Sequence, residues 1–380
     1  MISVVIPTYK EADSIQEVVR RSGKALAESG EEYELIVVDD NSGDGTAELA
    51  EELGEEFHVR VLRRAGRLGL ATAVVDGWKL AKGDLLGVID ADLQHPPEIL
   101  VALAAALRQS NADLAVASRY IAGGGTSDWE FLRRVISSGA THLAASVLPL
   151  RLSAVSDPMS GMFVVRAAAI SGAELSPMGY KILLEVLARG RIEHVVEVPY
   201  QFEERTRGTS KLGARQYAEY LAHLIRLAFA TGQCRSWVLY SLVGLTGAVL
   251  DIGLIYWMSA RADASIFCAV PLAVEAALLW NFLWNQKGTF ARRLRSIPEK
   301  KRSASRLWRY QKACLPGEVL NIVLTLALVS QGVRLVLSAA AGVVLDGAVN
   351  LAFNVPTIWK IWGPRVSAPI DRVSGGQKQA

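Results

Sequence analysis

The sequence has little cysteine and little net charge, and its first residues lack the features of a leader. Cys234, Cys268 and Cys314 have no motif spacing, which fits free thiols on the reducing side of a membrane. The formal net charge of +3 is too small to indicate a nucleic-acid partner. The opening MISVVIPTY has no basic flank and no long apolar core, so we expect a strand there and not a signal peptide.

Apolar residues are abundant, and the longest apolar stretches lie in the last third of the chain. They make up 51% of the 380 residues, with a mean hydropathy of +0.24, which is high for a wholly soluble protein. Four stretches approach the ~20 residues that span a bilayer: 237–260, 264–286, 313–333 and 335–358. Buried helices of a soluble domain are the weaker alternative, because four such lengths exceed an ordinary core. We predict an all-α transmembrane domain of four helices.

The stretch between the second and third apolar segments is strongly basic. Residues 287–312 contain ten Lys or Arg residues and one acid, Glu299. The positive-inside rule places such a loop in the cytoplasm, where it can also hold anionic lipid at about 1 kcal/mol per basic residue. An even number of spans then places both termini in the cytoplasm. We expect a multi-pass protein of the cell membrane.

The N-terminal part of the chain alternates short β-branched runs with helix-like segments. This rhythm covers 2–7, 13–29, 34–40, 59–63, 69–81 and 85–90. It predicts βαβ units in a mainly parallel, Rossmann-like α/β sheet. Ligands of such sheets bind beyond the carboxyl ends of the strands, where PTYKE, VVDDNSGDGT and DADLQ follow. The expected domains are a cytoplasmic domain at 1–232, a membrane domain at 233–363 and a polar tail at 364–380.

The segment DADLQ places two acids and an amide directly after an apolar strand. Residues two apart share a face of an extended chain, so Asp90, Asp92 and Gln94 would point the same way. The two carboxylates would repel each other unless a cation lies between them. Carboxylate and amide oxygens suit Mg²⁺ or Mn²⁺, with phosphate oxygens completing the shell. The alternative is that Asp92 or a neighbour caps the helix implied by HPPEILVALAAALRQ.

Seven short motifs follow one another along the first 232 residues. They are PTYKE (7–11), VVDDNSGDGT (37–46), GLATAVVDGW (69–78), DADLQHPPE (90–98), ASRY (117–120), DPMSGMF (157–163) and RTRGTSKLG (205–213). In this order they resemble the family 2 glycosyltransferases that make dolichyl or polyprenyl phosphate mannose. DADLQHP followed by ASRY and DPMSG is specific to that subgroup, whereas Asp-x-Asp alone is weak. One departure is Lys10, where the family usually has Asn.

The resemblance implies a GT-A fold that transfers mannose, with inversion, from GDP-mannose to a polyprenyl phosphate with the help of Mg²⁺ or Mn²⁺. It assigns the metal and the diphosphate to Asp90, Asp92 and Gln94. The residues it assigns to the nucleoside are Pro7, Tyr9, Glu11, Val38, Asp39 and Asp40. For Asp39 and Asp40, an Asx turn into GDGT is the alternative.

The resemblance also assigns basic residues to the phosphate of the lipid acceptor and to the phosphates of the nucleotide-sugar donor. Arg119, and Arg133 with Ser137, match the family positions that bind the lipid phosphate, an anion that needs cations and no strong base. Arg205 and Lys211 would close over the donor phosphates on a Gly-containing loop. A solvated surface charge is the alternative for any single Arg.

Asp157 is a predicted site residue without an assigned role, and helix capping is its alternative. Two segments, 129–150 and 215–230, mix aromatic, aliphatic and basic residues, which suits helices that lie on a bilayer. Core helices are the alternative for both segments.

Each predicted span carries one acid: Asp251, Glu275, Glu318 and Asp346. An acid costs up to about 3 kcal/mol at a helix centre, so we expect these to face the bundle interior or lie near its ends. NFLWNQKGTF (281–290) and the four-span layout are similar to GtrA-like membrane domains, though Gly288 replaces the usual Trp. That resemblance implies an anchor for the enzyme, and the sequence does not show whether it also flips the product.

Other functions stay open at this point. The spacing of these residues does not distinguish GDP-mannose from UDP-glucose. A membrane transport or anchoring protein with an inactive transferase domain is an alternative from another class. A processive polysaccharide synthase is disfavoured, because the Gln-x-x-Arg-Trp signature is missing. A homo-oligomer through the membrane helices has no strong signal for or against it.

Overall fold

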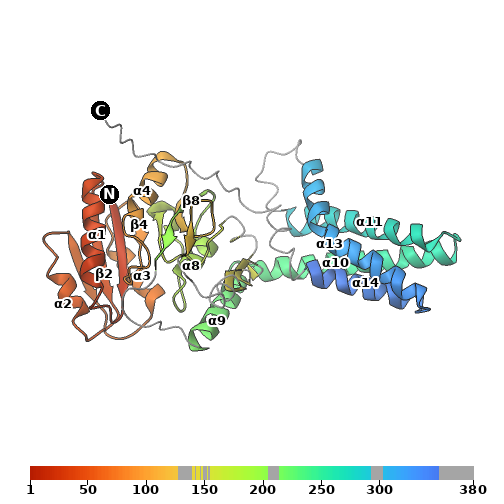
Figure 1. Cartoon of the computed structure of the whole chain (residues 1–380), viewed down its shortest axis with the longest axis horizontal. Coiled ribbons are helices and arrows are strands. Elements are labelled where there is room, and N and C mark those ends of the chain that lie inside the picture. The colour runs from red at the N-terminus through yellow and green to blue at the C-terminus, as the bar shows by residue number, and fades with distance from the viewer. Residues whose placement is uncertain are drawn as a thin grey trace. The chain divides into compact units, whose positions relative to one another are not determined.

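The chain forms two compact units, one of residues Met1–Leu227 and one that begins at Ala228. The structure is a computed structural model that describes residues 1–126, 139–141, 143–145, 147, 148, 152, 155–203, 214–291 and 303–350. Figure 1 shows a sheet with helices in the N-terminal unit and long helices in the second.

The N-terminal unit is built on a seven-stranded sheet with the order β3-β2-β1-β4-β7-β5-β8. Only β7 runs antiparallel to its neighbours in this sheet, which confirms the predicted mainly parallel α/β class. A separate short pair joins β6 to β9. The strands are β1 Ile2–Thr8, β2 Tyr33–Asp39, β3 Val59–Arg63, β4 Leu85–Val88, β5 Leu114–Ser118, β6 Gly125–Thr126, β7 Phe163–Arg166, β8 Val195–Pro199 and β9 Gln201–Phe202.

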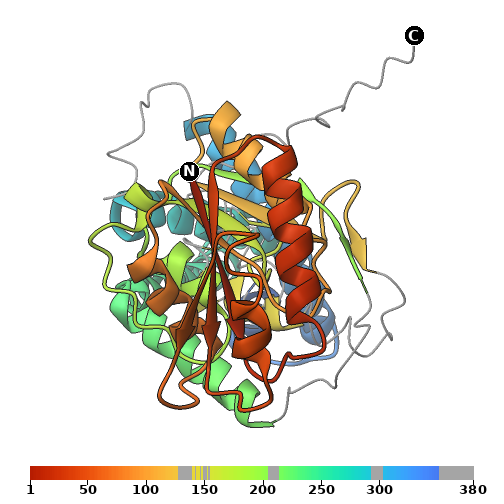
Figure 2. The ribbon, with the colours of Figure 1, turned by 90° about the vertical axis from the view of Figure 1, so that its left-hand side faces the viewer.

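Helices cover both faces of this sheet. The helices that the structure describes in this part of the chain are α1 Ile15–Glu28, α2 Thr46–Glu51, α3 Leu70–Leu80, α4 Ile99–Gln109, α7 Ala167–Ile170, α8 Ile182–Arg189 and α9 Ala214–Ala230, of which α9 ends in the second unit. Val4 and Ile6 of β1 join one buried cluster with apolar residues of α1 and α4, whereas Val5 points to the other face. There, a Cβ on Gly77 of α3 would lie 2.7 Å from the Val5 methyl carbons, so the glycine lets α3 approach the sheet. Figure 2 shows α1, the bright red helix, beside the first strands.

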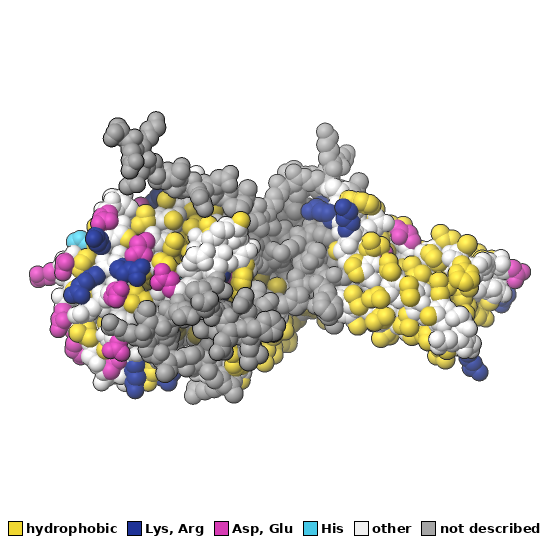
Figure 3. Space-filling model, in the orientation of Figure 1, with side chains coloured by type: hydrophobic (Ala, Val, Ile, Leu, Met, Phe, Trp, Pro, Cys, Tyr) yellow, Lys and Arg dark blue, Asp and Glu magenta, His cyan; other side chains and the backbone are white. Residues whose placement is uncertain are grey.

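The second unit contains the helices α10 Gln233–Ala260, α11 Ile266–Trp284, α13 Ser303–Ser330 and α14 Leu335–Val349. A π-helical turn, η1 Asn285–Thr289, continues α11. Three helices of this unit, over Gln233–Ala260, Ile266–Thr289 and Ser305–Ser330, are long and apolar enough to cross a membrane. Hydrophobic side chains cover much of their visible surface (Figure 3). The end of the fourth predicted span, 351–358, lies outside the described residues.

The helix that contains most of the third predicted span begins before residue 313. Helix α13 begins at Ser303, so Arg306, Arg309 and Lys312 of the predicted basic loop are helical. The amphipathic first turns of α13 continue directly into its apolar part, and a hydropathy criterion alone misses the polar turns of one long helix.

Two of the acids in the predicted spans are buried within the second unit, as expected. Asp251 is 2% exposed and Glu318 is 9% exposed. The Asn321 side-chain amide on α13 donates to Asp251 Oδ2 on α10 at 3.3 Å. The other two acids are half-buried, and each accepts from an amide side chain: Glu275 from Gln311 and Asp346 from Asn350.

Helices α13 and α14 come close at Gly342. A Cβ at this position would lie 2.9 Å from the backbone oxygen of Asn321 and would also press on the Asn321 and Thr325 side chains. Gly347, on the same helix, faces open space within the described residues. The two glycines therefore differ in packing while sharing one helix.

We predict that Gly342→Ala lowers the thermal unfolding midpoint of the purified protein in detergent. The added methyl must separate α13 and α14, and such overpacking typically costs about 1–3 kcal/mol. Gly347→Ala is the matched control, where alanine's better helix propensity should leave the midpoint unchanged or slightly higher. Equal midpoints for the two variants would contradict the close approach at Gly342.

Candidate active site

Three of the sequence motifs lie at one edge of the sheet. Parallel pairing sets Thr8, the last residue of β1, opposite Asp39, the last residue of β2. Strand β4 lies on the other side of β1 and ends at Val88, two residues before Asp90. PTYKE, VVDD and DADLQ therefore leave the sheet side by side, as the sequence predicts. Pro7 and Val38 are buried in the two strands, whereas Tyr9 and Glu11 follow β1 and are partly exposed.

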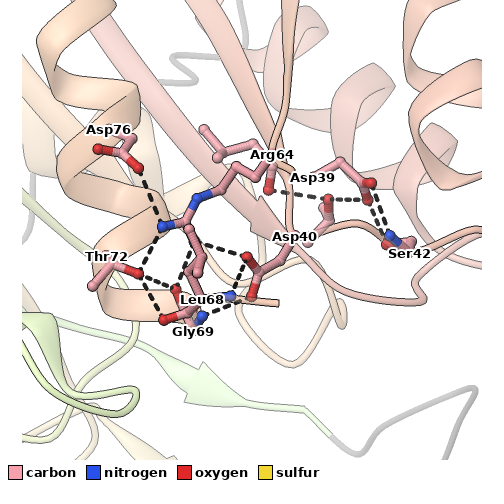
Figure 4. A network of polar contacts seen from close by, with 10 residues as sticks. Asp39, Asp40, Ser42, Arg64, Leu68, Gly69, Thr72 and Asp76 are labelled. Atoms are coloured by element: carbon pink, nitrogen blue, oxygen red, sulfur yellow. Dashed lines mark hydrogen bonds and ion pairs between the residues drawn. The ribbon is translucent and has the colours of Figure 1, made fainter. Parts of the chain in front are cut away.

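Asp39 is buried and holds the turn that follows β2. Its Oδ2 accepts from the Ser42 backbone N–H at 3.0 Å, and its Oδ1 accepts from the hydroxyls of Ser42 and Thr8 (Figure 4). The Ser42 hydroxyl in turn accepts from the Lys10 backbone N–H at 2.8 Å. The Asx turn that was the alternative here is made instead by Asp44, which accepts from the Thr46 backbone N–H at 3.1 Å.

Asp40 is also buried, and it fixes the loop that leads into α3. Its Oδ1 accepts from Arg64 Nη1 at 2.8 Å and from the Leu68 backbone N–H at 2.9 Å, while its Oδ2 accepts from the Gly69 backbone N–H at 2.8 Å. Figure 4 shows the carboxylate enclosed by these donors. Asp40 therefore holds the loop of residues 64–69 in place through these hydrogen bonds.

Two arginines of this loop, Arg64 and Arg67, were not predicted from the sequence. Arg64 is buried and also bonds Thr72 and Asp76 of α3, at 2.9 and 3.2 Å. Arg67 places its guanidinium 4.2 Å from the ring centroid of Tyr9, a cation–π contact. No local spacing rule links Asp40 with an arginine 24 residues later, so this pairing needs the fold.

The expectation of an extended DADLQ segment was wrong. Strand β4 ends at Val88, and Leu93 has a left-handed backbone with φ of 60°. Asp92 Oδ1 accepts from the Gln94 backbone N–H at 3.2 Å, an Asx turn that competes with continued extension. The capping alternative is also wrong, because α4 begins only at Ile99 and Glu98 is its N-cap.

A tight contact joins DADLQ to DPMSG. A Cβ on Gly161 would lie 2.8 Å from Asp90 Cγ and closer still to a carboxylate oxygen, so only glycine leaves room for Asp90. Behind this contact, the His95 ring stacks on Tyr200 with centroids 5.4 Å apart. Burial lowers the pKa of His95 to about 4, which keeps the ring neutral. The stacked rings of His95 and Tyr200 therefore support the turn without adding charge.

A buried ion pair joins ASRY to DPMSG. Arg119 Nε and Nη2 donate to the two Asp157 oxygens at 2.7 and 2.8 Å, and the Arg119 backbone N–H donates to Oδ2 at 3.2 Å. Arg119 is 8% exposed and Asp157 is fully buried. Burial opposes the charged guanidinium, but the Asp157 carboxylate outweighs it and raises the pKa of Arg119 above its usual value. Asp157 is thus an ion-pair partner, and helix capping, its alternative, was wrong.

Lys181 is a further basic residue of this region that the sequence analysis missed. It lies just before α8, and its Nζ donates to the Met159 backbone oxygen of DPMSG at 2.8 Å. The predicted phosphate ligands Arg133, Ser137, Arg205 and Lys211 lie outside the described residues.

Comparison with known proteins identifies the family. Residues 3–169 match the model for glycosyl transferase family 2, and residues 239–359 match the GtrA/DPMS transmembrane domain. A dolichol-phosphate mannosyltransferase of Pyrococcus furiosus is 39% identical over 360 residues, which cover 94% of this chain and 99% of the relative. The chain belongs to the dolichol-phosphate mannosyltransferase family. Its N-terminal unit is a GT-A glycosyltransferase domain, followed by the apolar C-terminal helices.

Two further proteins are similar to this chain. A dolichol-phosphate mannosyltransferase of Saccharomyces cerevisiae is 37% identical over 236 residues, which cover 59% of this chain and 86% of the relative. The solved structure of a Pyrobaculum calidifontis mannosyltransferase with GDP-Man and Mn²⁺ is 15% identical, with a TM-score of 0.41 over 92% of this chain and 86% of that chain.

We predict that Asp157→Asn strongly destabilises the N-terminal unit of this family member. Removing one partner of a buried ion pair typically costs about 3–5 kcal/mol, because the remaining charge stays buried without compensation. The measurement is the thermal unfolding of the full chain in detergent, followed by circular dichroism. The control is Glu55→Gln, which also replaces a carboxylate with an amide but on an exposed residue. An unchanged midpoint for Asp157→Asn would show that the pair does not hold the two motifs.

Proposed function

We propose that the chain transfers mannose from GDP-mannose to a polyprenyl phosphate, with inversion, at the cytoplasmic face of a membrane. The observation that carries this proposal is the meeting of ASRY and DPMSG beside DADLQ, through the Arg119–Asp157 ion pair and the contact of Gly161 with Asp90. These are the motifs on which the resemblance to the phosphate mannose enzymes rests. The similarity to the Pyrococcus relative along nearly the whole chain supports the same activity.

The reaction is a single displacement at the anomeric carbon of mannose. A lipid phosphate oxygen forms a bond to this carbon while its bond to the β-phosphate oxygen breaks, and GDP leaves with the bonding electrons. The lipid phosphate is already an anion at neutral pH, so the site needs no strong base. The residues of the chain have to hold the phosphates and the sugar in line.

Asp90, Asp92 and Gln94 fit a divalent cation, Mg²⁺ or Mn²⁺, through their hard oxygen ligands. Within the described part of the chain, no three His, Cys, Asp or Glu side chains form a group that could hold a metal. Phosphate oxygens of the donor would complete the coordination shell. When bound, the cation stabilises the charge that develops on the departing diphosphate.

The nucleoside would bind at the ends of β1 and β2, against Pro7, Tyr9, Glu11 and Val38. Asp39 would support this surface by holding the turn at Ser42, and Asp40 by holding the loop at 64–69. Asp40 already accepts three hydrogen bonds, so it acts on the nucleoside by holding the loop that carries Arg67. Arg205 and Lys211 stay predicted ligands of the donor phosphates, and Arg133 and Ser137 of the lipid phosphate.

Transfer of labelled sugar tests the proposed function. Purified full-length protein in lipid receives a polyprenyl phosphate, Mg²⁺ or Mn²⁺, and either labelled GDP-mannose or labelled UDP-glucose. We expect an acid-labile labelled lipid from GDP-mannose alone. Label from UDP-glucose alone would overturn the sugar and the nucleotide, and label from neither would overturn the transferase activity.

We predict that Asp92→Asn lowers kcat by roughly 100-fold or more, because loss of such electrostatic stabilisation has effects on that order. The asparagine keeps an oxygen for the Gln94 backbone N–H and removes only the charge. The measurement is mannose transfer at saturating Mn²⁺, together with Mn²⁺ affinity, and Glu55→Gln is the control. Wild-type kcat and Mn²⁺ affinity in Asp92→Asn would contradict the metal site.

We also propose that α9 lies on the membrane surface. Tyr217, Leu221 and Ile225, spaced by four residues, are 40, 46 and 57% exposed. The opposite side of the helix is fixed to the catalytic unit, where Tyr220 donates to the Ala140 backbone oxygen and His223 contacts Glu185, each at 2.7 Å. The exposed apolar stripe is thus held in a fixed direction, as an interfacial helix requires.

Brominated lipids test the position of this stripe. In a cysteine-free background, a fluorescent label at Ile225→Cys is expected to be quenched by brominated acyl chains in nanodiscs. The control is Ala222→Cys, which is exposed about a quarter turn away on the same helix. Equal quenching at the two positions, or none at Ile225→Cys, would contradict the interfacial placement.

A further inference from the structure

Residues 179–181 connect the start of α3 with the DPMSG segment. The Gly179 backbone oxygen accepts from the Ala71 backbone N–H at 3.2 Å. Two residues later, Lys181 Nζ donates to the Met159 backbone oxygen at 2.8 Å. The backbone of this short segment is therefore fixed by α3, and the ammonium group of Lys181 is fixed by DPMSG.

The DPMSG segment also brings Lys181 near the predicted metal residues. Gly161, two residues after Met159, packs against Asp90, because a Cβ on this glycine would lie 2.8 Å from Asp90 Cγ. Asp90 and Asp92 both attract the Lys181 ammonium group. Lys181 is thus a positive charge close to the two carboxylates that are predicted to hold a divalent cation.

Two further charges that act on Lys181 are already paired with each other. Asp157 directs both of its oxygens to Arg119, so the attraction by Asp157 and the repulsion by Arg119 largely offset each other. The attraction by the two carboxylates of DADLQ is what remains. Burial lowers the pKa of Lys181 to about 8, and most of the ammonium group is therefore still charged at pH 7.

We propose that Lys181 makes the binding of the divalent cation depend on the nucleotide, an inference that rests on the metal site of the proposed function. A fixed ammonium group near Asp90 and Asp92 opposes the entry of another cation, so it weakens metal binding in the absence of nucleotide. The diphosphate of the nucleotide adds negative charge, which the same ammonium group attracts. Lys181 therefore disfavours the metal alone and favours the metal together with the diphosphate.

Two binding measurements at pH 7 test this inference on the full-length protein in detergent. The first is the affinity for Mn²⁺ without nucleotide, measured from the EPR signal of free Mn²⁺, and the second is the affinity for GDP at saturating Mn²⁺. Lys181→Met keeps a long unbranched side chain and removes the charge. We expect it to bind Mn²⁺ more tightly and GDP more weakly, each on the order of 10-fold, as for a unit charge acting across a partly hydrated site.

Three other variants complete the experiment. Lys181→Arg keeps the charge, so both affinities should stay close to those of the wild type. Lys181→Gln removes the charge but keeps a side-chain donor for the Met159 oxygen, and it replaces Lys181→Met if that variant has a lower unfolding midpoint. Lys24→Met, at an exposed lysine of α1, is the control for the loss of a positive charge elsewhere.

Only opposite shifts of the two affinities support the inference. Unchanged affinities, or a change in one affinity alone, overturn it, while binding of GDP with Mn²⁺ by the wild type keeps the metal site. Weaker binding of both ligands by Lys181→Met and Lys181→Gln would mean that Lys181 only holds the DPMSG segment, and this also overturns it. A wild type that binds no Mn²⁺, with or without GDP, would overturn the metal site itself, and the inference would fail with it.

Discussion

The buried ion pair between Arg119 and Asp157 is the interaction on which the candidate site depends. It connects the end of β5 with the segment before β7, which are 38 residues apart in sequence. The same segment contains Gly161, which makes room for the Asp90 carboxylate, and Met159, which fixes Lys181. A buried ion pair tolerates little displacement, because a buried charge is costly in free energy once the opposite charge has moved away. The pair therefore helps to set the positions of Asp90 and Lys181.

A second buried pair has the corresponding role on the other side of DADLQ. Arg64 and Asp40 are 5 and 4% exposed, and together they hold the loop at 64–69 against Tyr9. In both places an arginine that directly follows a strand, Arg119 after β5 and Arg64 after β3, neutralises a buried carboxylate of the same unit. The two pairs lie on opposite sides of β4 in the sheet order. DADLQ thus follows a strand that lies between the two ion pairs in the sheet order.

The sequence predicts those parts of this arrangement that depend on local patterns. Strand β3 has the predicted bounds, and α1 and α3 lie within the predicted segments, because β-branched runs and helical periodicity report local burial. The turn at Asp92 was missed because a side chain that bonds a backbone N–H two residues later competes with strand extension. Arg64 and Lys181 were missed because their partners come from distant segments, and no spacing rule reports a contact that only the fold creates.

In the second unit, polar side chains lie at places where two helices come close together. Helices packed among apolar surroundings cannot leave a buried carboxylate or amide without a partner at low cost. Here a glycine on one helix admits a polar side chain from the next: Gly247 admits Asn281, Gly317 admits Asp346 and Gly342 admits Asn321. Asn321 then reaches Asp251 across the bundle. The close approach of the backbones therefore makes room for these polar groups, and a larger residue at Gly342 would affect both the helix packing and the contact of Asn321 with Asp251.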